Sequence, residues 1–78
     1  MKNIGGLNMQ INSSDLVEDE TYVLRFDFIQ SPTIRHNFGT EVTYLGEIDN
    51  NGDKVLVKVK DSTSKGFKIP ISFLKRKD

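Results

Sequence analysis

One hairpin signal constrains the fold of this chain more than any other feature. Asn51-Gly52 lies between two stretches in which apolar and polar residues alternate. Asn and Gly favour the two central positions of a type I′ turn, where both residues have positive φ. Counting outward from such a turn pairs Ile48 with Val55 and Tyr44 with Val59. The stretch therefore predicts an antiparallel hairpin with one apolar face and one mixed face.

Length and composition limit the remaining possibilities. A chain of 78 residues forms one small domain, and its formal net charge is zero. It has no cysteine and one histidine, which excludes disulfides, thiolate zinc sites and all-histidine metal sites. No cofactor is expected. The absence of a basic-then-apolar leader and of a run of about 18 apolar residues predicts a cytoplasmic protein with no membrane contact.

The stretches on either side of the central hairpin predict further strands. Thr21 to Ile29 alternates, with Tyr22, Leu24, Phe26 and Phe28 on one face, so we expect one long aromatic strand there that forms the floor of the core. Residues 30–40 break this pattern and predict a long loop. Residues 67–69 predict a short strand that ends at Pro70, and 71–74 predict one helical turn followed by a charged tail.

This order of elements divides the chain into two segments. Residues 1–12 are expected to be an N-terminal arm, for which a flexible end and an edge strand are alternatives. Residues 13–78 are expected to be the domain, entered through a loop or helical turn at Ser13 to Leu16. The predicted class is all-β, with four or five antiparallel strands and a short C-terminal helical turn.

The order and its ending resemble the SH3-like small β-barrel. The resemblance is carried by the strand from Thr21, the long loop at 30–40, the central hairpin and the ending Phe67-Lys68-Ile69-Pro70-Ile71-Ser72-Phe73-Leu74. It implies a small barrel. SH3 domains that bind polyproline use a Trp and several Tyr residues beside an acidic loop. This chain has no Trp, and 30–40 contains no acid, so the resemblance does not imply PxxP binding.

The residues give little support for catalysis or metal binding. His36 is the only side chain expected to titrate near neutral pH, and no carboxylate lies close to it in sequence. Asp49 to Asp53 lacks the spacing of a calcium loop, because Lys60 stands where the bidentate Glu is needed. We therefore expect a protein that is not an enzyme.

Two surfaces are candidates for binding a protein partner. Ile34, Arg35, His36 and Phe38 lie in the long loop, and such loops often carry function. Leu45 and Leu56 fall on the outer face of the central hairpin, where apolar residues can form a contact patch. The expected function is a non-catalytic protein-interaction module. Its richness in Asn, Lys and Ile suits an accessory or regulatory protein of a bacterium or phage.

The alternative is a nucleic-acid-binding small barrel. Its contacts would be made by lysines of the second half of the chain, namely Lys54, Lys58, Lys60 and Lys68. Clustered lysines can bind phosphates. Exposed strands also carry lysines simply to prevent edge pairing and aggregation.

Overall fold

The computed structural model describes residues 11–77, whose regular structure consists of β-strands and 3-10 turns. The predicted all-β class is confirmed. The strands are β1 (Thr21–Leu24), β2 (Phe28–Ser31), β3 (Ile34–His36), β4 (Glu41–Ile48), β5 (Lys54–Val59), β6 (Phe67–Pro70) and β7 (Leu74–Arg76). The 3-10 turns are η2 (Ser13–Asp15) and η3 (Ile71–Phe73).

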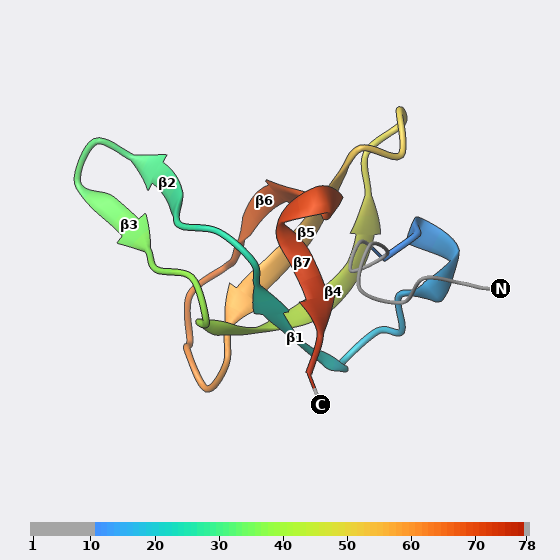
Figure 1. Ribbon diagram of the computed structural model, residues 1–78, viewed down its shortest axis with the longest axis horizontal. Helices are drawn as coiled ribbons and strands as arrows, with labels where there is room; N and C mark the ends of the chain where they lie inside the picture. Colours follow the sequence, from blue (N-terminus) through green and yellow to red (C-terminus); the bar gives the residue numbers. More distant parts are fainter. Residues whose placement is uncertain (1–10, 78) are drawn as a thin grey trace, which may run out of the picture.

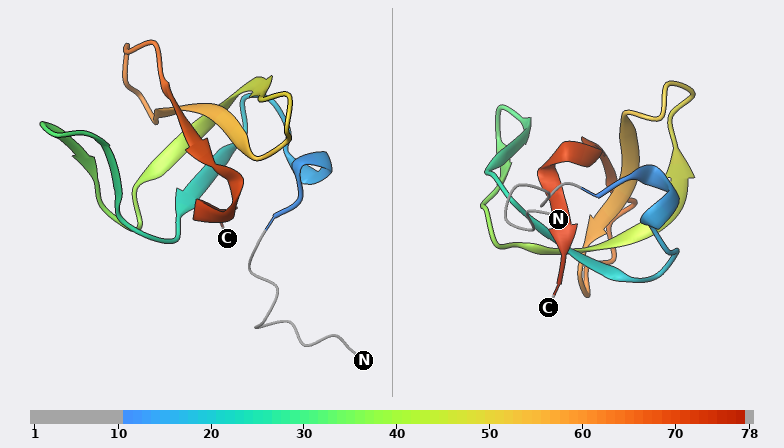
Figure 2. Two further views of the ribbon diagram at one scale, coloured as in Figure 1. Left: turned by 90° about the horizontal axis from the view of Figure 1, so that it is seen from above. Right: turned by 45° about the vertical axis from the view of Figure 1, so that its right-hand side comes forward.

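The seven strands form two antiparallel sheets. The larger sheet has the order β6-β5-β4-β1-β7, so the last strand returns to the side of the first. β2 and β3 form a separate hairpin that projects from the larger sheet (Figure 1), and the view from above shows the same projection (Figure 2). β6 and β7 are the edges of the larger sheet, and no closed barrel is found in residues 11–77.

The central hairpin, β4–β5, has the predicted register only close to its turn. Ile48 lies opposite Val55 as expected, but Tyr44 lies opposite Val57, so the predicted pairing with Val59 is wrong. A β-bulge near Gly46, whose φ is +93°, gives β4 two more residues than β5 between these pairs. Ile48, which belongs to the predicted apolar face, is 41 % exposed.

The turn of this hairpin is longer than predicted. The Asp49 N–H donates to the Lys54 carbonyl at 2.9 Å, and the Gly52 N–H donates to the Asp49 carbonyl at 2.8 Å. Gly52 has φ +74°, whereas Asn51 is not among the positive-φ residues of the described chain. The type I′ prediction is therefore wrong. Four residues, 50–53, connect the strands, as is common around a type I turn.

The predicted long aromatic strand is divided in two. β1 ends at Leu24, and the Arg25 N–H still donates to the Phe73 carbonyl of η3 at 2.7 Å, in the register of the β1–β7 ladder. The chain bends there, and β2 begins at Phe28. Phe26, which had been assigned to the core, is 50 % exposed. Residues 30–40, predicted as a loop, supply most of the β2–β3 hairpin.

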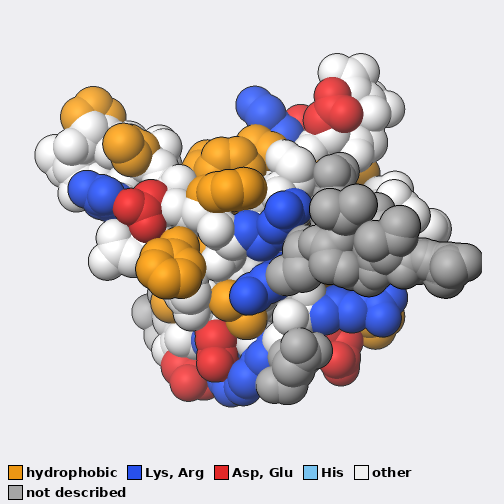
Figure 3. Space-filling view, viewed as in Figure 1, with side chains coloured by type: hydrophobic (Ala, Val, Ile, Leu, Met, Phe, Trp, Pro, Cys, Tyr) orange, Lys and Arg blue, Asp and Glu red, His pale blue; other side chains and the backbone are white. Residues whose placement is uncertain are grey.

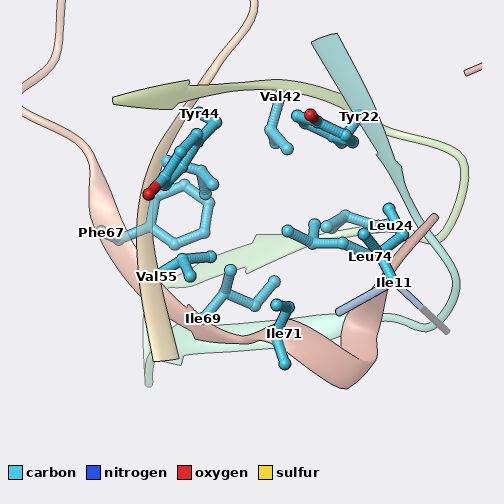
Figure 4. Packing of buried hydrophobic residues seen from close by; sticks show 11 residues of the cluster. Ile11, Tyr22, Leu24, Val42, Tyr44, Val55, Phe67, Ile69, Ile71 and Leu74 are labelled. Carbon is cyan, nitrogen blue, oxygen red and sulfur yellow. The ribbon is translucent and has the colours of Figure 1, made fainter. Parts of the chain in front are cut away.

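The core lies on the inner face of the larger sheet. Figure 4 shows its side chains pointing toward one another from the strands and from η3. The core members are Ile11, Tyr22, Leu24, Val42, Tyr44, Val55, Val57, Phe67, Ile69, Ile71 and Leu74. Ile11 lies near the end of the predicted N-terminal arm, and it packs into the core. Residues 1–10 of that arm lie outside the described residues.

The C-terminal part agrees with the predicted strand and helical turn but not with the predicted tail. β6 and η3 occur where expected. Leu74 pairs with Leu24 and is fully buried, while Lys75 pairs with Val23 on the outer face. The charged tail therefore begins as an edge strand, because its alternation continues the in-and-out pattern of a sheet.

Candidate functional site

The β2–β3 hairpin rests on the larger sheet through stacked rings. His36 stacks on Phe67 with ring centroids 4.3 Å apart and ring planes 3° from parallel. Phe28 stacks against the same ring at 5.8 Å. His36 Nε2 lies 2.8 Å from Gln30 Oε1. Partial burial lowers the pKa of His36, because desolvation disfavours the imidazolium.

Four phenylalanines continue from this stack across the surface. We call them the aromatic face: Phe26, Phe28, Phe38 and Phe73. The Phe73 ring meets Phe26 edge-on at 5.4 Å and Phe28 edge-on at 5.6 Å. Phe26 is 50 % and Phe38 71 % exposed. Hydrophobic side chains gather on the hairpin and on the adjoining body of the protein, with Lys and Arg side chains beside them (Figure 3).

A shallow pocket of about 260 Å³ joins Phe38 to the rest of the aromatic face. One Arg25 guanidinium nitrogen donates to the Ser72 carbonyl at 3.1 Å, and the guanidinium carbon lies 5.2 Å from the Phe26 ring centroid. The pocket thus has two cations and no acid among its lining residues. These residues are Leu24, Arg25, Phe26, Phe38, Gly39 and Lys75.

Asp27 is the one acidic residue between positions 21 and 40, and each of its carboxylate oxygens has a partner within the chain. Its carboxylate accepts a hydrogen bond from Arg35 at 2.6 Å and another from the Phe38 N–H at 2.7 Å. The hydrogen bond from Arg35 is the main reason why the pKa of Asp27 is lowered. Asp27 therefore holds the Arg35 side chain and the Phe38 backbone in position.

Four of the predicted protein-binding residues come together on or beside the hairpin: Ile34, Arg35, His36 and Phe38. Ile34 is 43 % exposed, and its strand neighbour Ile29 is 67 % exposed. Arg35 and His36 are both engaged, with Asp27 and with Phe67 respectively. Phe38 and Ile34 are thus the members of this set with the most apolar surface to offer.

Leu45 and Leu56 do not join this surface. Both are half-buried on the larger sheet, in β4 and β5. A Cβ added at Gly66 would lie 2.9 Å from Leu45 Cδ1, so Leu45 lies against the end of the β5–β6 connection.

Sequence reasoning missed the surface position of Phe26. It was assigned to the core because the stretch from Thr21 alternates, but it is 50 % exposed. Phe28, assigned to the core by the same alternation, is partly buried and packs against the core, as does Phe73. Alternation alone gives no signal that distinguishes Phe26 from Phe28.

Most lysines of the predicted nucleic-acid-binding surface have hydrogen-bond or ion-pair partners within the chain. Lys58 Nζ donates to the Ser62 carbonyl at 3.0 Å. Two further ion pairs have N–O distances of 3.4 Å for Lys60–Glu41 and 2.5 Å for Lys68–Asp49. Hydrogen bonds from Lys77 and Lys60 lower the pKa of Glu41, and the hydrogen bond that Lys68 donates to Asp49 raises the pKa of Lys68.

Residues 11–77 contain no group of three His, Asp or Glu side chains that could hold a metal ion. In the same part of the chain no helix is long and apolar enough to cross a membrane. No protein-family model matches the sequence, and no match is found among curated proteins or solved structures. The candidate site therefore depends on geometry alone.

Proposed function

We propose that this protein is a non-catalytic protein-interaction module that binds its partner through the aromatic face. The observation that carries the proposal is the exposure of Phe26 and Phe38, at 50 % and 71 %, beside two cations. Burying a Phe side chain contributes about 1.5–3 kcal/mol. The exposed parts of these two rings therefore offer free energy that a binding partner can gain by covering them. Exposed apolar patches of this kind typically mark interaction sites.

The order of the elements supports an SH3-like architecture for the module. A first strand is followed by a long hairpin and by the three consecutive strands β4, β5 and β6. A 3-10 turn then leads into β7, which pairs with β1. In this arrangement a long hairpin and a short turn flank one exposed surface. That surface is the aromatic face, with Phe26 and Phe28 contributed by one side and Phe73 by the other.

Nucleic-acid binding through the lysines is the alternative proposal. Three of the four lysines have internal partners, and a phosphate would have to compete with Glu41, Asp49 or the Ser62 carbonyl. Lys54 has no ion pair within residues 11–77 and is the best single probe of this alternative.

Affinity capture from a lysate of the source cell tests the two proposals together. The immobilised protein is compared with Phe38→Ser and with Ile48→Ser, a matched apolar control at the far turn. Ile48 is also exposed, at 41 %. We expect a partner that resists nuclease, is lost with Phe38→Ser and is kept with Ile48→Ser. Capture that disappears with nuclease and with Lys54→Glu would replace this proposal by the alternative.

A further inference from the structure

We propose that the aromatic face selects acidic peptide segments that carry a large apolar side chain, with the apolar group entering the pocket between Phe26 and Phe38 and the carboxylates meeting Arg25 and Lys75. This inference rests on the proposed function and specifies its partner. It depends on three features of the pocket, namely its charge, the fixed position of Arg25 and its size.

The charged side chains that line the pocket have one sign. Its lining includes Arg25 and Lys75 and no acidic residue. Asp27, the nearest acid in sequence, is held by Arg35 and by the Phe38 amide. Lys75 has no ion pair or side-chain hydrogen bond within residues 11–77. An incoming carboxylate therefore meets cations that are not already neutralised, while an incoming Lys or Arg is repelled.

Arg25 is held in position before any ligand arrives. One of its guanidinium nitrogens binds the Ser72 carbonyl, and the group lies over the Phe26 ring. A guanidinium has five N–H donors, so donors remain for a carboxylate after the bond to Ser72 is made. Because the side chain is fixed by η3 and by Phe26, binding costs little further loss of rotamer freedom.

The size of the pocket fits one side chain. Its volume of about 260 Å³ is smaller than the roughly 300–1,000 Å³ of sites that enclose whole small molecules. Its walls include the exposed ring of Phe38 and the half-exposed ring of Phe26. A Leu, Ile or Phe side chain of a peptide can cover both rings, while the flanking backbone lies across the remaining aromatic face.

Selection from a phage-displayed library of random dodecapeptides tests this inference. The full-length protein is the target, and each enriched peptide is then synthesised with a fluorescent label. Affinities are measured by fluorescence anisotropy for the wild type and for Phe38→Ser, Lys75→Glu and Lys54→Glu. Lys54→Glu makes the same charge change beside the β4–β5 turn. Circular dichroism establishes that each variant is folded.

We expect the enriched peptides to combine Asp or Glu with Leu, Ile or Phe. Phe38→Ser should weaken binding roughly tenfold or more through lost apolar burial. Lys75→Glu should weaken it roughly tenfold through repulsion, and Lys54→Glu should leave it nearly unchanged. Added salt should weaken binding as well.

The other outcomes separate the two proposals. Peptides that depend on Phe38 but are basic, proline-rich or neutral would overturn the acidic selectivity and leave the interaction face standing. A selection in which no peptide depends on Phe38 would overturn both the face and its selectivity.

Discussion

The larger sheet and the β2–β3 hairpin use apolar residues in opposite ways. In the sheet, Leu24, Ile69 and Leu74 have 0 % exposure. In the hairpin, Ile29 and Ile34 are 67 % and 43 % exposed. β1, β4, β5 and β6 of the sheet contain buried positions in alternation with more exposed ones, whereas neither strand of the hairpin contains a buried residue. The apolar residues of the sheet therefore hold the fold, and those of the hairpin remain free to contact another molecule.

The two regions also differ in how they are attached. Each strand of the larger sheet is joined to a neighbour by a ladder of backbone hydrogen bonds. The hairpin pairs only with itself and meets the sheet through side chains, chiefly His36 and Phe28 on Phe67. Backbone pairing resists surface substitution, whereas a side-chain contact can be altered by one residue. The hairpin is thus the part whose surface can change without loss of the fold.

The largest expected effect comes from a matched pair of isoleucine substitutions. Ile69→Ala should lower the free energy of unfolding by about 2–5 kcal/mol, because it opens a cavity in the core. Ile29→Ala should change it by no more than about 0.5 kcal/mol, because the side chain is mostly in water. Urea melts of both variants measure the difference. Similar losses at the two positions would mean that the exposed residues of the hairpin stabilise the fold as much as the core residues of the sheet do.

A smaller effect is expected at Gly52, in the turn between β4 and β5. Its φ of +74° lies in the left-handed region, which costs a residue with a side chain roughly 1–2 kcal/mol. Gly52→Val should therefore destabilise by more than about 1 kcal/mol in a urea melt. Gly52→Asn is the control, since Asn tolerates positive φ and should lose less. Equal stability of Val and Gly at this position would refute the described turn.

The sequence predicts elements well where one face of a strand is buried. The strand ending at Pro70, the helical turn after it and the Ile48–Val55 pair all follow from alternation and turn chemistry. The bulge at Gly46 could not be predicted, because a glycine within a strand marks several different irregularities. It shifts every pair beyond it, so the predicted partner of Tyr44 was wrong.

The candidate site was predicted only in part, for a physical reason. Phe38 and Ile34 were identified because their loop breaks the pattern of alternation. Phe26 was missed because alternation cannot distinguish a strand that continues from one that bends. β1 ends at Leu24 and β2 begins at Phe28 in a second sheet, so Phe26 lies between two strands that pair with different parts of the chain. Local sequence does not record these pairings.

The smallest predicted effect concerns the pH dependence of the hairpin attachment. The pKa of His36 is lowered from 6.5 in the folded protein by burial against Phe67. The unfolded chain then binds the proton more readily, so this contribution is complete above pH 6.5 and is lost as pH falls through the folded pKa. His36→Phe keeps a ring on Phe67 but cannot titrate, and the chain has no other histidine.

Urea melts at about pH 8 and about pH 5.5 bracket this range and stay above the usual carboxylate range. The wild type should lose more stability than His36→Phe between the two conditions. The carboxylates with lowered pKa, Asp27 and Glu41, titrate at lower pH and affect both proteins alike. Parallel losses in the two proteins would mean that His36 is solvated in the same way in both states. The stacking of His36 on Phe67 would then not be what attaches the hairpin to the sheet, and the proposed difference in attachment between the two regions would be wrong.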